Sequence, residues 1–124
     1  MGQIYNFKCN CGYKKTAAIG EGKTGMMLEV IREMFSSDEL SEFEETLKGS
    51  MPNYYHGKML AYCFACRELM SAQKLRYVAG GMTKIIIKPC EICGEPLHPC
   101  DTRITVSCPV CADTLSAEEA GLWD

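Results

Sequence analysis

Short runs of apolar and β-branched residues, separated by turn residues, recur along the chain and predict β-strands. Gly80 and Gly81 lie between two of these runs and are typical of a hairpin turn. The run Ile85-Ile86-Ile87 is β-branched throughout, so we expect a buried strand there. The predicted strands are residues 3–8, 13–19, 54–63, 75–79, 84–88 and 103–107.

Between residues 24 and 49 the apolar positions change to a helical period. A first stripe predicts a helix with Thr24 as its N-cap. Ser36-Ser37-Asp38-Glu39 is typical of the start of a second helix, because the helix dipole favours acidic side chains in the first turn. Gly49 is a natural end for this helix. The two stripes consist of Met27, Val30, Ile31, Met34 and Phe35, and of Leu40, Phe43 and Leu47.

Eight of the nine cysteines form four close pairs: Cys9/Cys11, Cys63/Cys66, Cys90/Cys93 and Cys108/Cys111. The last two pairs have the spacing Cys-x2-Cys-x14-Cys-x2-Cys, which is typical of a four-thiolate zinc ribbon. The first two pairs are separated by the helical segment and are expected to form a second site. Soft thiolates in tetrahedral geometry suit zinc, so the sequence predicts two zinc ions.

This grouping predicts an α+β protein made of two small zinc-ribbon-type antiparallel β units. Residues 1–88 would form a split ribbon with a two-helix insert at about 24–49, and residues 89–124 a C-terminal ribbon. A unit as short as the second usually needs its metal to fold. The ligands of the first site would be Cys9, Cys11, Cys63 and Cys66, and those of the second Cys90, Cys93, Cys108 and Cys111.

We call each close cysteine pair, with the residues between its two cysteines, a knuckle. The first knuckle is unusual, because Cys9 and Cys11 are separated by one residue where zinc knuckles have two or more. Gly12 follows directly and can adopt a positive φ, which would let the loop bring both thiolates to one ion. The long segment between Cys11 and Cys63 need not prevent this site, because closure entropy grows slowly with loop length.

The cysteines are expected to be reduced and the protein cytoplasmic. A secreted disulfide framework is the alternative, but nine is an odd number and residues 1–8 contain no apolar signal region. No stretch reaches transmembrane length, so we expect no membrane partner. Reduced thiols fit the redox state of the cytosol.

The formal net charge of −3 becomes more negative when four thiolates surround each zinc ion. This balance disfavours non-specific binding to a phosphate backbone, which depends on clustered lysine and arginine. A protein partner is therefore favoured, while nucleic acid stays open.

Cys100 and His98 stand outside the four pairs. Cys100 could be a buried, inert thiol, a replacement ligand, or a reactive, redox-sensing thiol. His98 could be an exposed loop residue or a ligand. The sequence contains no visible nucleophile–base pair, and four-cysteine sites leave no open metal position. We therefore expect no catalytic residues, no enzymatic activity and no small-molecule substrate.

Tyr5-x-Phe7-x-Cys9-Asn10-Cys11-Gly12-Tyr13 resembles the first half of a zinc ribbon and Tyr62-Cys63-x2-Cys66 its second half. Cys90-x2-Cys93-Gly94 with Cys108-Pro109-x-Cys111 resembles a further ribbon. The chain thus resembles the zinc-ribbon or rubredoxin-like superfamily, and is similar to small uncharacterised bacterial zinc-ribbon proteins. The resemblance implies architecture more than activity.

Two functions follow as hypotheses. The first is a non-catalytic adaptor in protein interactions, or possible nucleic-acid interactions, with structural zinc sites. The alternative is an iron-loaded electron carrier or thiol-based redox sensor, because rubredoxins hold one iron in four cysteines and carry electrons. The Cys-x-Cys knuckle and the helical insert depart from the rubredoxin pattern.

Overall fold

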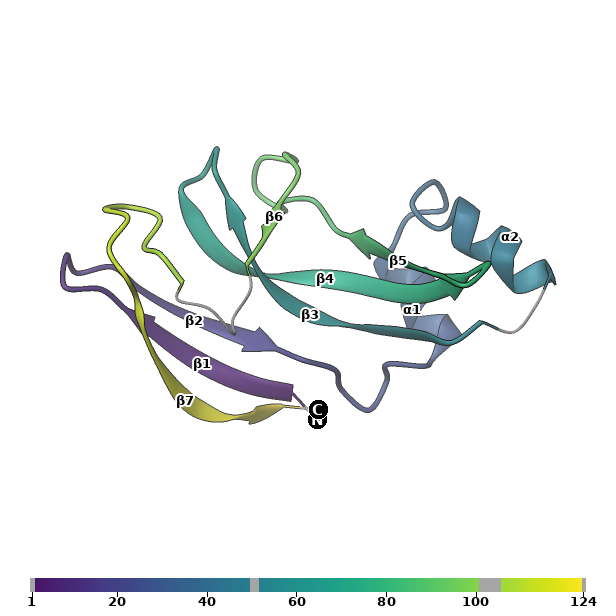
Figure 1. Cartoon of the computed structure of the whole chain (residues 1–124), viewed down its shortest axis with the longest axis horizontal. Helices are drawn as coiled ribbons and strands as arrows, with labels where there is room; N and C mark the ends of the chain where they lie inside the picture. Colours follow the sequence, from purple (N-terminus) through teal and green to yellow (C-terminus); the bar gives the residue numbers. More distant parts are fainter. Residues whose placement is uncertain (1, 50–51, 101–105, 124) are drawn as a thin grey trace.

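The computed structural model describes residues 2–49, 52–100 and 106–123. These residues form a mixed α+β fold with mostly antiparallel strands (Figure 1). Its elements in chain order are β1 (Gly2–Lys8), β2 (Lys14–Ile19), α1 (Leu28–Met34), α2 (Ser41–Gly49), β3 (Tyr54–Cys63), β4 (Glu68–Ala79), β5 (Met82–Ile87), β6 (His98–Pro99) and β7 (Ser116–Trp123).

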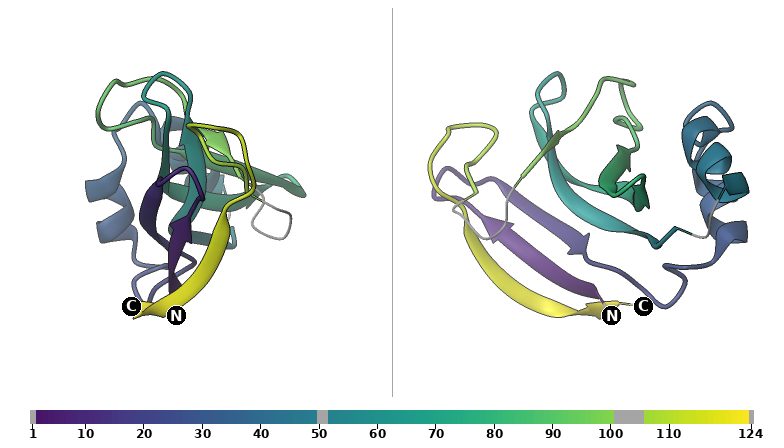
Figure 2. Two further views of the ribbon diagram at one scale, coloured as in Figure 1. Left: turned by 90° about the vertical axis from the view of Figure 1, so that its left-hand side faces the viewer. Right: turned by 45° about the vertical axis from the view of Figure 1, so that its right-hand side comes forward.

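The strands are arranged in a three-stranded sheet of order β2-β1-β7 and a four-stranded sheet of order β5-β4-β3-β6. An isolated bridge between Gly20 and Lys58 connects the end of β2 to β3. The three-stranded sheet lies at one end of the molecule and the two helices at the other, with the long β3–β4 hairpin between them (Figures 1 and 2).

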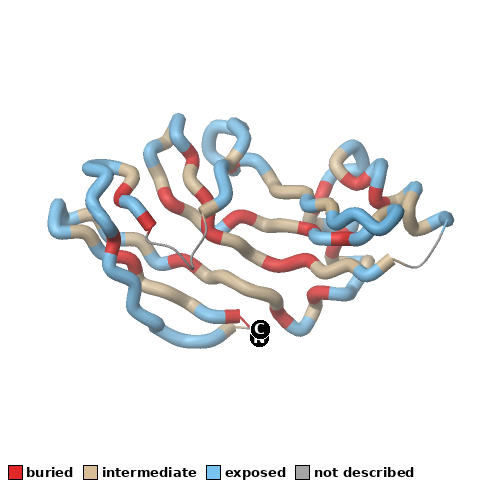
Figure 3. The backbone as a smooth tube through the Cα atoms, in the orientation of Figure 1, coloured by how far each residue is buried: buried red, intermediate tan, exposed pale blue. Residues whose placement is uncertain are grey.

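The β3–β4 hairpin contributes residues to two separate cores, and its buried positions are red in Figure 3. The register pairs His56 with Leu75 and Leu60 with Ser71, so even-numbered residues of β3 and odd-numbered residues of β4 share a face. At one end this face meets the three-stranded sheet, and at the other it meets the helices. The first core contains Phe7, Ala17, Leu60, Leu69, Val106, Cys108 and Leu115, and the second Ile31, Phe35, Leu40, Phe43, Leu75 and Tyr77.

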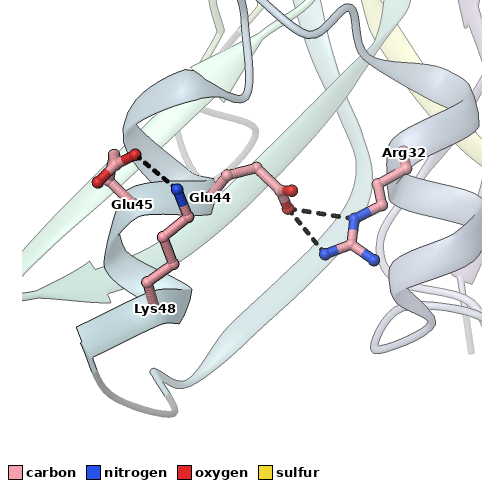
Figure 4. Close-up of polar contacts among 4 residues, drawn as sticks. All are labelled: Arg32, Glu44, Glu45 and Lys48. Atoms are coloured by element: carbon pink, nitrogen blue, oxygen red, sulfur yellow. Dashed lines mark hydrogen bonds and ion pairs between the residues drawn. The ribbon is translucent and has the colours of Figure 1, made fainter.

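The helices are held to the second core by aromatic packing and to each other by one ion pair. The ring of Phe43 packs edge-on against Tyr77, with their centroids 5.1 Å apart. Arg32 of α1 donates to Glu44 of α2 at 3.0 Å (Figure 4). Because both groups of this pair are well exposed, it contributes no more than about 1 kcal/mol. Burial of the apolar stripes therefore positions the helices.

The two expected helices and the strands expected at 3–8, 13–19, 54–63, 75–79 and 84–88 are present, most of them with different boundaries. Gly80 and Gly81 have φ angles of 59° and 80°, which confirms the hairpin turn between β4 and β5. The first helix begins at Leu28 after Met27, which makes no side-chain cap, so Thr24 is not its N-cap. The strand expected at 103–107 falls largely on residues 101–105, which lie outside the described residues.

The prediction of a buried strand at Ile85–Ile87 is wrong. β5 is the edge strand of its sheet, and Ile85 is 54% exposed. The β-branched run specified a strand correctly, but β-propensity does not determine whether a strand lies at the centre or at the edge.

The described residues of 89–124 do not form a sheet of their own. β7, near the C-terminus, pairs antiparallel with β1 from Lys8↔Ser116 to Gly2↔Trp123. β6 pairs with β3. The expected boundary between residues 88 and 89 therefore does not divide the two sheets. None of the described helices is long and apolar enough to cross a membrane.

Candidate metal centres

The eight paired cysteines gather in two clusters, each able to hold a metal ion. Within each cluster all four sulfur atoms lie within 4.8 Å of one another. One cluster joins segments near the two ends of the chain, and we call it the outer cluster. We call the other the inner cluster. The outer cluster consists of Cys9, Cys11, Cys108 and Cys111, and the inner cluster of Cys63, Cys66, Cys90 and Cys93.

The sulfur spacing fits tetrahedral coordination. A metal–sulfur bond of about 2.3 Å places tetrahedral ligands about 3.8 Å apart. In the outer cluster the Sγ atoms of Cys9 and Cys111 are 3.4 Å apart. In the inner cluster those of Cys66 and Cys90 are 3.9 Å apart. A disulfide would require about 2.05 Å, and all nine cysteines are free.

The outer cluster is assembled by the pairing of β1 with β7. These strands are antiparallel and Lys8 lies opposite Ser116, so the loop after β1 and the loop before β7 meet at one end of the sheet. The inner cluster forms in the same way around β3. Tyr62 lies opposite His98 of β6, which brings the loop before β6 beside the end of β3 at Cys63.

The structure therefore combines the pairs differently from the expected grouping. We expected Cys9/Cys11 with Cys63/Cys66 and Cys90/Cys93 with Cys108/Cys111, whereas the first pair joins the fourth and the second joins the third. The prediction favoured pairs that are close in sequence, but loop closure adds little cost at greater separations. Strand pairing decided which knuckles meet.

All four knuckles share one backbone feature: the residue after the second cysteine has a positive φ. A positive φ turns the chain back after the second cysteine. In three knuckles the N–H of the first cysteine then donates to the carbonyl two residues beyond the second: Cys9 to Tyr13 at 2.9 Å, Cys90 to Glu95 at 3.0 Å and Cys108 to Asp113 at 2.7 Å. Gly12 was recognised from the sequence for this role, but the non-glycine residues gave no such signal. The residues are Gly12 (102°), Arg67 (54°), Gly94 (77°) and Ala112 (69°).

Backbone amides also stabilise one thiolate in each cluster. N–H groups two and three residues after Cys90 lower the pKa of its thiol to about 7. For Cys108, burial acts in the opposite direction, but the equivalent N–H groups prevail and lower its pKa to about 7. Hydrogen bonds with Cys93 and Cys63 raise the pKa of Cys66 to about 12. A cation entering either cluster must displace protons, so its affinity rises with pH.

A hydrogen bond connects the two clusters. The hydroxyl of Tyr62, next to the inner ligand Cys63, donates to the carbonyl of Ser107, next to the outer ligand Cys108. Between the knuckle that starts at Cys63 and the one that starts at Cys108 lies a hollow of about 330 Å³. It is lined in part by Phe64, Arg67 and Pro109. The sequence did not indicate the hydrogen bond, because Tyr62 and Ser107 belong to distant segments of the chain.

Cys100 and His98 lie outside both clusters. Burial raises the pKa of the Cys100 thiol to about 11, which disfavours the thiolate needed for a reactive cysteine. Cys100 packs against the first core, as expected for an inert thiol. His98 is exposed, and its ring contacts Phe64 with centroids 4.5 Å apart.

The comparisons with known proteins identify no relative: no family model, no curated protein and no solved structure matches this chain. The metal-site interpretation therefore depends on the eight cysteines and their geometry.

Proposed function

We propose that this protein is a non-catalytic zinc protein in which two structural ions hold the fold together and present a surface for a protein partner. The observation that carries the proposal is the pair of four-thiol clusters with near-tetrahedral sulfur spacing. Four sulfur ligands favour zinc over hard cations, which prefer oxygen. They also leave no position open for water or substrate, so the ions would be structural.

The knuckles support the interaction role, because apolar side chains stand exposed between the metal ligands. Phe64 is 66% exposed, Ile92 78% and Val110 61%. Each lies between the two cysteines of its knuckle, where metal binding would fix the backbone. Together with the hollow between Phe64 and Pro109, they offer rigid apolar contacts of the kind that protein interfaces use.

Native mass spectrometry with elemental analysis tests the metal part of the proposal. Protein purified without added metal or chelator should carry two zinc ions. Cys93→Ser and Cys108→Ser should each lose one ion, whereas Cys100→Ser should retain both. A metal-free wild type, or equal losses in all three variants, would contradict it.

The interaction part is tested by affinity capture from native lysate. The triple variant Phe64→Ser/Ile92→Ser/Val110→Ser should lose a partner that wild type enriches. Met82→Ser is the control, because Met82 is 67% exposed but lies at the β4–β5 turn. Absence of an enriched partner, together with no nucleic-acid retention at low salt, would contradict the adaptor role.

An iron-loaded electron carrier or redox sensor is the second candidate. Its support is the exposure of Cys11, Cys93 and Cys111, which would bring a bound metal close to the surface. A red, aerobically purified sample containing iron would favour it. A colourless sample whose thiols do not respond to peroxide would contradict it.

A further inference from the structure

The C-terminal strand β7 is attached to the fold in an unusual way. Seven of its eight residues are exposed, so apolar burial contributes little along its length. Its backbone pairs with β1 alone, at the edge of the three-stranded sheet. The strand therefore depends on what fixes its two ends.

The start of β7 is fixed by the outer cluster. Cys111 and Cys108 precede it, and they join Cys9 and Cys11 at the end of β1. Leu115, directly before the strand, is buried beside Cys108 in the first core. A metal ion in this cluster would clamp the start of β7 to the end of β1.

The far end of β7 is fixed by Trp123. Its indole N–H donates to the carbonyl of Ile19 at 3.1 Å. The Lys58 ammonium lies 4.7 Å from the ring centroid, a cation–π contact. The ring also lies so close to Gly2 that a Cβ there would be 2.1 Å from it. One aromatic side chain thus connects β7 to β1, β2 and β3.

The two clusters differ in accessibility. In the outer cluster Cys11 and Cys111 are both exposed, whereas in the inner cluster only Cys93 is. A chelator can therefore approach the outer ion more easily. The inner cluster closes the end of the β3–β4 hairpin and involves no residue of β7.

From these observations we infer that the outer metal ion is a releasable latch for β7, whereas the inner ion is a permanent part of the fold. The inference depends on the proposed metal binding and deepens it. Loss of the outer ion frees β7 from β1 and leaves the edge of β1 open, while the β3–β4 hairpin and the helices stay folded. Because coupling between sites is reciprocal, undocking of Trp123 must also loosen the outer ion.

A matched pair of ligand variants tests the first half. Cys111→Ser and Cys93→Ser each remove an exposed last ligand of one cluster. Hydrogen exchange of zinc-loaded Cys111→Ser should show loss of amide protection in residues 116–123 and in those N–H groups of β1 that face β7, with protection retained in 54–79. Emission of Trp123, the single tryptophan, should shift to the red. Cys93→Ser should instead lower amide protection in 54–79, because the inner cluster closes the β3–β4 hairpin. The inference would be overturned if β7 keeps its amide protection in Cys111→Ser, or if the whole Cys111→Ser protein unfolds.

A variant far from the ligands tests the reciprocal half. Trp123→Ala leaves all eight ligands in place, and Leu122→Ala, which removes an exposed neighbour, is its control. A chelator should extract one of the two zinc ions from Trp123→Ala more readily than from wild type, by about 5- to 150-fold for a typical coupling energy. The other ion and the control should behave as wild type.

The outcomes separate the two proposals. If Trp123→Ala binds two zinc ions and releases both at wild-type rates, the latch is overturned and the zinc proposal stays intact. If Trp123→Ala releases both ions faster by the same factor, the latch is also overturned, because release of the inner ion should not depend on β7. A wild-type protein that binds no zinc would contradict the proposed function itself.

Discussion

At the scale of single residues, the most informative positions are those that follow each second cysteine. Gly94 and Ala112 occupy equivalent places, with φ angles of 77° and 69°. A side chain in this region of backbone space costs about 1–2 kcal/mol relative to ordinary helical geometry. Ala112 bears that cost and Gly94 avoids it.

Gly94→Ala should therefore lower the free energy of unfolding of the zinc-loaded protein by about 1 kcal/mol. No heavy atom lies within 4 Å of a Cβ placed there, so the effect is confined to the backbone. Gly49→Ala is the control: it has equal space but ends helix α2 without a positive φ, so alanine there should not lower the free energy of unfolding. Denaturant unfolding measures both, and equal changes in the two variants would contradict this explanation.

The buried thiol of Cys100 predicts a loss of stability in alkaline solution. Burial raises its pKa from 9.0 to about 11 in the folded protein. Between these values the unfolded chain has released the proton that the folded protein retains, so the free energy of unfolding falls as pH rises. Cys100→Ala should flatten this decline between pH 9 and 10, as measured by denaturant unfolding. An unchanged slope in that window would show that the thiol is not the cause.

At the scale of elements, local signals predicted local structure well. Ser36 and Glu39 form a reciprocal cap, with Ser36 N–H donating to Glu39 Oε1 at 2.8 Å and Glu39 N–H to Ser36 Oγ at 3.1 Å. The helix expected to start there begins at Ser41, after the turn that this cap closes. The Gly80-Gly81 turn was also predictable, because its φ angles suit glycine. The edge position of β5 was not, since it depends on which distant strands pair.

Ser36→Ala should reduce the free energy of unfolding by about 1 kcal/mol, because it removes one of these two hydrogen bonds. The neighbouring Ser37→Ala is the control, since Ser37 is exposed and donates or accepts no side-chain hydrogen bond among the described residues. Circular dichroism during thermal unfolding would measure both. A larger loss for Ser37→Ala would contradict the assigned cap.

At the scale of the whole molecule, the defining feature is the nested connection of the four knuckles. The sequence correctly indicated the eight candidate ligands and two clusters, because paired thiols at knuckle spacing have few other uses. The predicted combination of the pairs was wrong, because the sequence does not indicate which pairs combine. That depends on the pairing of β1 with β7, whose exposed side chains carry almost no hydrophobic signal.

The nested arrangement gives each ion a different place in the fold. The inner cluster closes a segment within the middle of the chain, and the outer cluster brings residues near both ends together. An ion in the outer cluster would close the longer loop and so exclude more conformations of the unfolded chain. Both ions would lie beside the knuckle side chains proposed to contact a partner.

The most direct test of this account is cadmium–proton correlation spectroscopy on protein loaded with two ¹¹³Cd ions, because each ion couples only to the β-protons of its own cysteines. One cadmium should correlate with Cys9, Cys11, Cys108 and Cys111, and the other with Cys63, Cys66, Cys90 and Cys93. A cadmium that correlates with Cys9, Cys11, Cys63 and Cys66 would contradict the nested arrangement.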